Sequence, residues 1–226
     1  MSRRERLAAF VHSEITNMKY AQQRNGENLH KCKMVYAGRY DTPIVLPETV
    51  TACSFVGFNY AQSCKIPSNH AVHFFIDDYQ FERLWSRPEL YLDLLSKFQF
   101  VCTPDFSTYT DYPRALQIYN HYRKHWLGSY WQQNGITVIP TISWGDPDSY
   151  SWCFDGEPVG SAVAVSSVGT QQSKRTRELF LQGYGEMMKR LEPSVVYFYG
   201  SIPTACGGNI IPIPAFQKRF SKKDGV

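Results

Sequence analysis

With 226 residues, 43% hydrophobic and 15% aromatic side chains, the chain is long and apolar enough to bury one substantial core, which excludes a disordered protein. Its formal net charge of +4 is too small to indicate a dedicated nucleic-acid module, whose basic residues are denser. No apolar run reaches the length of a membrane span and the N-terminus lacks a signal-peptide pattern, so we expect a single-domain cytoplasmic protein with no membrane partner.

The first part of the chain, residues 1–71, is expected to contain a helix followed by two entry strands. Apolar residues recur at helical spacing through residues 2–25. Two short β-like runs, interrupted by proline and glycine, follow at residues 41–47 and 51–60. These runs are candidates to join the sheet of the main fold.

Residues 72–200 are predicted to alternate strands with helices. Solid apolar runs predict five strands, at 72–77, 98–105, 136–142, 161–167 and 195–199. Helices are predicted at 79–85 with a break at Pro88, from Pro113 to about residue 133, around residues 149–154, and over 175–191. Residues 201–226 are expected to form a loop and a basic tail.

The alternation predicts an α/β fold with a parallel sheet. Parallel strands joined by helices are buried on both faces, so they appear as continuous apolar runs, as they do here. Adding the two entry strands brings the number to seven. We interpret this pattern as an irregular or partial TIM-like barrel built of βα units, with an open doubly wound sheet as the alternative.

Acidic residues follow several of the predicted strands. In both architectures the carboxyl ends of the parallel strands form the ligand-binding rim. Asp77 and Asp78 end the first strand of the core, Asp105 the second, and Asp146 follows the third. We take Asp78, Asp105 and Asp146 as candidate catalytic residues and as candidate ligands of Mg²⁺, because converging carboxylates bind hard cations or raise one another's pKa. Each could instead serve only as a turn former or helix cap.

A second group of candidates would bind the ligand itself. The fourth strand of the core ends in hydroxyls and glycine, and a helix begins among basic residues, an arrangement that suits a phosphate or carboxylate. The tryptophan after the third strand could stack on a ring. The predicted ligand-binding residues are Trp144, Ser167, Gly169, Thr170, Lys174 and Arg175. The alternative is that a Ser or Thr caps the helix and that the basic side chains are solvated.

Histidine and cysteine patterns are expected to be structural. Six cysteines include no CxxC pair, so no zinc knuckle or iron–sulfur motif is visible. His121 and His125 are one helical turn apart, but no HExxH glutamate lies between them. We expect these two side chains on a solvated helix face away from the rim, and we expect His73 at the opposite end of its strand from the rim.

Several motifs resemble a known family. They are FFIDDYQFERLWSRPELYL, PDFSTYTDYP, GITVIPTISWGD, CFDGEPVG and SSVG, with FYG near the end. Together they resemble a domain-of-unknown-function family of bacterial, archaeal and phage proteins, frequent in prophages and other mobile elements. The resemblance implies an intracellular setting on a phage or integrated element. It does not imply any particular reaction. Its motifs include Asp77, Asp78, Asp105, Trp144, Gly145, Asp146, Asp155, Gly156 and Gly169.

Three functions remain open from these patterns, and whether the protein is an enzyme is open with them. The first is metal-assisted action on, or binding of, a phosphorylated or nucleotide-like compound at the rim. The second is weak nucleic-acid binding by a mobile-element protein through its basic ends. The third is a non-catalytic inhibitor or binder of a host protein.

Overall fold

A computed structural model describes residues 27–51 and 53–213 of the chain. The helix predicted over residues 2–25 lies outside this part, as do the basic residues of both ends on which the nucleic-acid hypothesis depends. Within the part that is described, no helix is long and apolar enough to cross a membrane.

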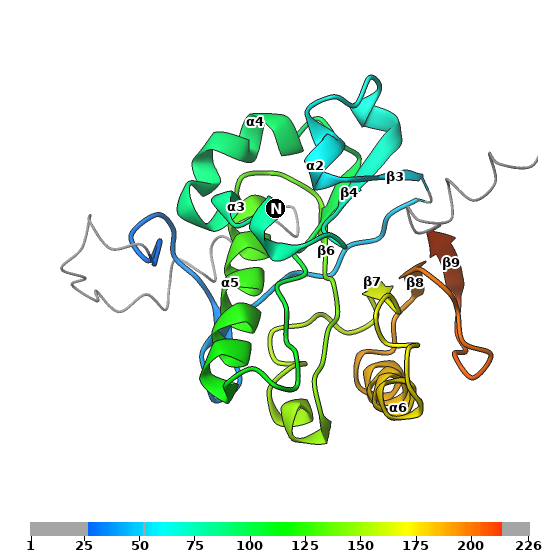
Figure 1. The fold of residues 1–226 in the computed structure, drawn as a ribbon. Helices are drawn as coiled ribbons and strands as arrows, with labels where there is room; N and C mark the ends of the chain where they lie inside the picture. Colours follow the sequence, from blue (N-terminus) through cyan, green and yellow to red (C-terminus); the bar gives the residue numbers. More distant parts are fainter. Residues whose placement is uncertain (1–26, 52, 214–226) are drawn as a thin grey trace, which may run out of the picture.

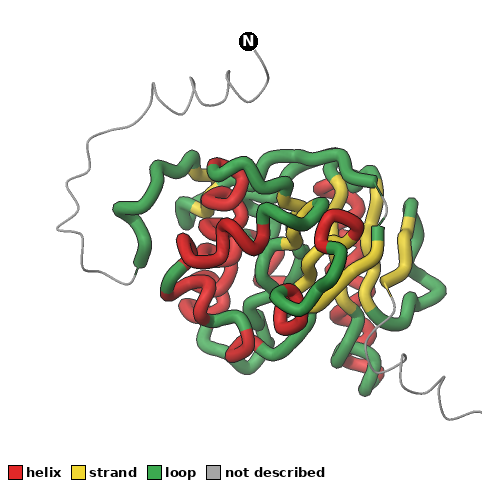
Figure 2. Tube along the Cα trace, turned by 90° about the horizontal axis from the view of Figure 1, so that it is seen from above, coloured by secondary structure: helices red, strands yellow, loops and turns green. Residues whose placement is uncertain are grey.

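The described strands of the main fold are all parallel and follow one another in chain order. They are β3 (Ser54–Gly57), β4 (His70–His73), β5 (Phe100–Cys102) and β6 (Val138–Ile139), then β7 (Ala162–Ser166), β8 (Val195–Tyr199) and β9 (Ile210–Ile213). A parallel bridge between Thr141 and Ala164 joins the two sheets between β6 and β7. Figure 1 shows this succession, and the strands lie side by side in the view from above (Figure 2).

Side chains from distant strands meet on one face of this layer. The ring of Tyr197 on β8 lies 5.2 Å from that of Phe55 on β3 and 5.6 Å from that of Phe100 on β5, between centroids. The sheet therefore curves until its two ends share a core. No ladder joins β9 to β3 among the residues described, so the fold is a partial or open α/β arrangement and not a closed TIM barrel. The strand order does not reverse as it does in a doubly wound sheet.

The two long helices flank the strand layer (Figure 1). They are α5 (Arg114–Gln133) and α6 (Lys174–Leu191), and both match the predicted spans closely. Val163 and Val165 of β7 pack with Phe180 of α6, whereas Ala162 and Ala164 belong to the core on the other side. Burial on both faces confirms the reason given for the continuous apolar runs.

The other helices of the described residues are short. They are α2 (Phe58–Ala61), α3 (Arg83–Ser86) and α4 (Leu92–Leu95), with 3₁₀ turns η1 (Pro67–Asn69), η2 (Asp78–Gln80), η3 (Pro88–Tyr91) and η4 (Pro147–Ser151). The break predicted at Pro88 separates α3 from η3, because proline lacks the N–H that a helix interior needs. The short helix expected around residues 149–154 is η4.

Three local predictions were wrong. Residues 41–47 do not join the parallel sheet, since β2 (Thr42–Pro43) pairs antiparallel with β1 (Tyr36–Ala37). The region after residue 200 is not only loop, because it contributes β9, which contains Pro212. Proline is tolerated in a strand at the end of a sheet, where a missing N–H breaks no ladder. His73 ends β4 instead of beginning its strand, so it lies at the rim side.

Candidate functional site

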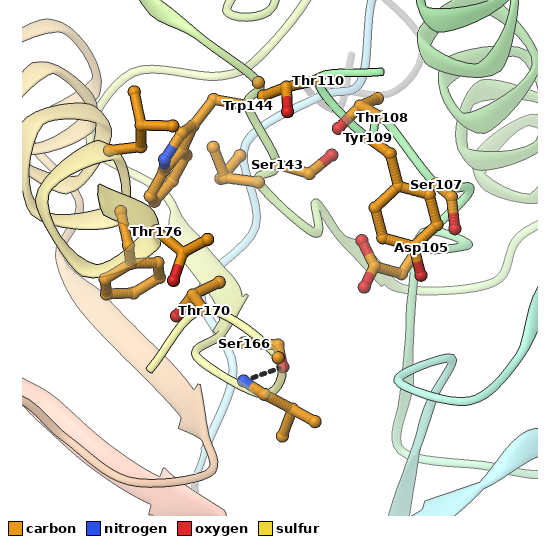
Figure 3. Close-up of a pocket in the computed structure, with 16 residues that line it drawn as sticks. Asp105, Ser107, Thr108, Tyr109, Thr110, Ser143, Trp144, Ser166, Thr170 and Thr176 are labelled. Atoms are coloured by element: carbon orange, nitrogen blue, oxygen red, sulfur yellow. Dashed lines mark hydrogen bonds between the residues drawn. The ribbon is translucent and has the colours of Figure 1, made fainter. Parts of the chain in front are cut away.

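A cavity of about 390 Å³ opens at the carboxyl ends of β5, β6 and β7, where the rim was predicted (Figure 3). It also borders the first turns of α6. Eight hydroxyl-bearing residues line it: Ser107, Thr108, Tyr109, Thr110, Ser143, Ser166, Thr170 and Thr176. Asp105 contributes the one carboxyl group among the lining residues of the described chain, and no lysine, arginine or histidine is among them. The cavity is therefore rich in neutral hydrogen-bonding groups and contains a single acid.

Asp105 follows β5 and faces this cavity while partly buried. Burial raises the pKa of its carboxyl group to about 7, because a charged carboxylate is poorly solvated there. The positive charge of Lys124 acts in the opposite direction, and the negative charge of Asp78 raises the pKa further. Near neutral pH the group can therefore either give or accept a proton at the cavity wall.

Asp78 supports the loop that carries Asp105. Its carboxylate accepts hydrogen bonds from the Ser107 N–H at 3.0 Å and from the Ser107 hydroxyl at 2.9 Å. From the other side, the Asn120 amide donates to the Ser107 carbonyl at 2.6 Å. Both oxygens of Asp78 are thus engaged in holding residues 105–110 in place, and the residue is not part of the cavity lining.

Asp146 caps a 3₁₀ turn and pairs with an arginine. It precedes η4, and its side chain accepts from the Ser149 N–H at 3.3 Å. One Arg114 nitrogen lies 3.1 Å from both carboxylate oxygens of Asp146. Gly145 borders the cavity but the Asp146 side chain does not. The charge of Asp78 thus acts on Asp105, whereas Asp146 pairs with Arg114 and is not among the residues that line the cavity.

Trp144 forms a wall of the cavity on the α6 side (Figure 3). Its ring lies 5.4 Å from that of Phe180 and rests on Gly183. A β-carbon on Gly183 would lie only 2.1 Å from the indole nitrogen of Trp144. The absence of a side chain at Gly183 therefore sets the position of the tryptophan that was predicted to stack on a ligand ring.

Exchanging Gly183 for alanine is expected to displace the Trp144 ring and to lower the free energy of unfolding by about 1–3 kcal/mol, the usual cost of overpacking. Gly185 on the same helix is a matched control, because a β-carbon there would meet nothing within 4 Å. Gly185→Ala should be neutral or stabilise by up to about 1 kcal/mol through helix propensity. Urea denaturation of both variants measures the difference, and equal effects would contradict the proposed contact.

The remaining predicted ligand residues separate into two groups. Gly169, with a positive φ of 80°, and Thr170 line the cavity. Ser167 is buried behind it and its hydroxyl donates to the Ser201 carbonyl at 2.6 Å. The Lys174 side chain is 91% exposed and lies 3.9 Å from Glu178, and Arg175 is also exposed. The basic residues at the start of α6 therefore face solvent and not the cavity.

The N-terminus of α6 is capped by neighbouring side chains. Ser173 and Thr176 form a capping box, in which the Ser173 hydroxyl accepts from the Thr176 N–H at 3.1 Å. This is the arrangement that the alternative interpretation of the segment described, with a hydroxyl residue capping the helix and solvated cations beside it.

A cluster of buried charges lies on α5. The expectation of a solvated face at His121 and His125 was wrong, since these side chains are buried, with exposed fractions of 3% and 0%. Lys124 between them is also buried, and its ammonium group lies 2.8 Å from a Glu157 carboxylate oxygen and 2.9 Å from the Thr141 carbonyl. His125 Nε2 lies 2.9 Å from the same Glu157 oxygen. These four residues form a polar cluster inside the fold.

Charge neutralisation explains how Glu157 tolerates this position. Burial raises the pKa of its carboxyl group, but His125 and Lys124 outweigh burial and hold that pKa below its usual range. For His121, burial lowers the pKa, and the neighbouring His125 and Lys124 lower it further. One signal could have found the cluster: Trp126, Leu127 and Trp131 share this stretch of helix, so its apolar residues are not confined to one face.

These features define a parallel α/β protein with a hydroxyl-lined cavity at the carboxyl ends of its strands. The chain belongs to the family described as Domain of unknown function (DUF4417), whose pattern matches residues 34–217. That span includes every motif on which the resemblance was based.

Two phage proteins are among its relatives. The chain is 48% identical over 165 residues to the Gene 1 protein of Mycobacterium phage L5, covering 72% of each chain. It is 40% identical over 165 residues to the Gene 1 protein of Mycobacterium phage D29, covering 72% of this chain and 61% of that protein. No solved structure matches the chain. The protein is therefore of a phage type.

Proposed function

We propose that the cavity at the ends of β5, β6 and β7 binds a small nucleoside-like compound and that Asp105 exchanges a proton or a hydrogen bond with it. The observation that carries this proposal is a carboxyl group with a pKa near 7 facing a cavity otherwise lined by hydroxyls. A group that titrates at the working pH is what general acid–base chemistry requires, and it is uncommon for an aspartate.

The lining chemistry supports a ligand with many hydrogen-bonding groups and a ring. Hydroxyl side chains both donate and accept, so they match sugar hydroxyls and base edges. Trp144, Phe180 and Tyr109 add aromatic surface on which a ring could pack. Because Lys174 and Arg175 face solvent, the lining favours the nucleoside portion of a ligand over its phosphate. A phosphate would depend on the loop at Gly169 and Thr170.

Mg²⁺ is the less favoured part of the original hypothesis. The oxygens of Asp78 are engaged by Ser107 and those of Asp146 by Arg114, so Asp105 is the carboxylate that remains free to face the cavity. Hard cations are usually held by several carboxylate or carbonyl oxygens together. A direct role of Asp105 toward the ligand is therefore preferred to a shared metal.

The test is a binding screen with nucleosides, nucleoside monophosphates and free hexoses, with and without Mg²⁺, followed by thermal unfolding and calorimetry. We expect at least one nucleoside to raise the unfolding temperature. Asp105→Asn should weaken its binding by about tenfold to a hundredfold, the effect of losing a hydrogen bond to an ionisable group. Asp146→Asn, outside the cavity, should retain binding. Failure of every compound to bind, or equal losses in both variants, would refute the proposal.

A further inference from the structure

The polar cluster on α5 contains three groups with the arrangement of metal ligands. His121 and His125 lie one helical turn apart on α5, and Glu157 follows the turn that packs against them. One ligand atom from each of the three lies within 4.8 Å of the others, and no other such group is found in the described part of the chain. The side chains of His125 and Glu157 are fully buried.

Both imidazole rings are oriented by main-chain carbonyls. His125 Nδ1 lies 2.9 Å from the Pro43 carbonyl, and His121 Nε2 lies 3.1 Å from the Asp155 carbonyl. A carbonyl oxygen only accepts, so these two nitrogens must carry the hydrogens. In the neutral rings, His125 Nε2 and His121 Nδ1 then have free lone pairs. Histidine ligands of metals are commonly fixed in this way through their second nitrogen.

Glu157 provides an independent indication that the cluster can hold a cation. Its Oε2 atom is fully buried and has no hydrogen-bond partner, although its Oε1 atom accepts from Lys124. Oε1 also lies 2.9 Å from His125 Nε2, which donates to it when that nitrogen carries a proton, so Oε2 is the oxygen left without a donor. A buried carboxylate oxygen without a donor is costly, and a bound metal ion would satisfy it.

We propose that His121, His125 and Glu157 form a buried site for a transition-metal ion of the zinc type, separate from the cavity at Asp105. Two nitrogens and one carboxylate oxygen form a donor set that binds zinc in preference to Mg²⁺ or Ca²⁺. Ligand atoms on a tetrahedral zinc ion lie about 3.3 Å apart. One ligand atom from each of the three residues lies within 4.8 Å of the others, so the side chains need to approach by no more than about 1.5 Å to reach that spacing.

Lys124 is the group that disfavours a second cation. Its ammonium group contacts Glu157 Oε1 and the Thr141 carbonyl, which leaves Glu157 Oε2 for the metal. A metal at this site would tie α5 to the turn before Glu157 and, through His125 and Pro43, to the β1–β2 hairpin.

The first experiment measures metal in the intact protein. We expect purified wild-type protein loaded with ZnCl₂ and then dialysed to retain about one zinc ion per chain by elemental analysis. CoCl₂ in its place should give the visible absorption bands of a protein-bound tetrahedral site. EDTA should lower the unfolding temperature of the loaded protein. Glu157→Gln should lose the metal, while His30→Gln, at an exposed histidine, should keep it.

Because the Glu157 variant could unfold, ring-nitrogen NMR of the wild-type protein gives a second measurement. Metal at the site requires His125 Nε2 to carry no hydrogen and to shift on adding zinc. If His125 instead shows N–H signals at both nitrogens that zinc does not change, and no metal is retained, the cluster is a metal-free ion-pair network and the proposal is overturned. Neither result depends on whether the cavity at Asp105 binds a nucleoside.

Discussion

Glu157→Gln is expected to lower the free energy of unfolding of the metal-free protein by about 3–5 kcal/mol, the usual cost of removing one partner from a buried ion pair. The side chains of Lys124 and Glu157 are 1% and 0% exposed, so water does not solvate the Lys124 ammonium group once the carboxylate is removed. Lys124 would keep its contact with the Thr141 carbonyl but would have no adjacent carboxylate in this cluster. Urea denaturation in EDTA, so that any metal is absent, measures the loss.

An exposed pair of the same type is the control. Glu186 and Arg190 lie one turn apart on α6 at 2.8 Å, with side chains 29% and 42% exposed. Glu186→Gln should cost no more than about 0.5 kcal/mol, because solvent screens such pairs. Combining Lys124→Met with Glu157→Gln should recover part of the stability by removing the uncompensated charge. Similar losses for Glu157→Gln and Glu186→Gln would show that the buried pair contributes no more to the free energy of unfolding than an exposed pair.

Asp105→Asn is expected to stabilise the protein at pH 8 and to leave its stability nearly unchanged at pH 4. The pKa of Asp105 is raised from 3.8 to about 7 in the folded state, so between these values the unfolded chain releases a proton that the folded protein retains. Wild-type stability therefore falls as the pH rises through this window and levels off above it. Allowing for solvent in the cavity, the loss is about 2–4 kcal/mol, and asparagine removes it.

Urea denaturation of wild type and variant between pH 4 and pH 8 tests this expectation. Asp148→Asn is the control, because the Asp148 side chain is 90% exposed and should give no comparable dependence on pH. Parallel stability curves for wild type and Asp105→Asn would mean that Asp105 titrates as an ordinary surface carboxylate. The proton-exchange role in the proposed function would then lose its basis.

A stabilising effect of Asp105→Asn together with weaker ligand binding would indicate that Asp105 serves ligand binding and not the stability of the fold. A group that costs stability at neutral pH is retained at functional sites when its chemistry is needed. The two measurements on one variant therefore distinguish a functional carboxyl group from a structural one. Exchanging Asp78 for asparagine is instead expected to lower the stability, since the hydrogen bonds that Asp78 accepts from Ser107 stabilise the loop.

The sheet and the long helices could be predicted because their signals are local. The run VVYFY became β8, and the segment between Pro113 and Asn134 became α5, as the apolar pattern and the helix punctuation indicated. The rim was also predictable, since the carboxyl ends of parallel strands lie at one edge of a sheet. Asp105, Trp144, Gly169 and Thr170 were assigned to that rim on this basis, and in the structure they line the cavity.

Other parts could not be predicted because they depend on partners distant in the chain. Nothing around β9 distinguishes it from a loop until β8 is beside it. Asp146 follows a strand as Asp105 does, but Arg114, 32 positions away, turns it into an ion-pair partner. The sequence pattern alone does not distinguish a rim acid that faces a cavity from one that faces an arginine.

The amino-acid sequence by itself determined which segments become strands and helices and which strand ends carry polar groups, because spacing, proline and glycine act over a few residues. Only the tertiary structure decided that His121, Lys124 and His125 are buried. Their polarity predicted solvent, but Glu157 and the carbonyls of Pro43, Thr141 and Asp155 meet them inside the fold. Burial of a polar group is permitted by its partners, and those partners come together only when the chain has folded.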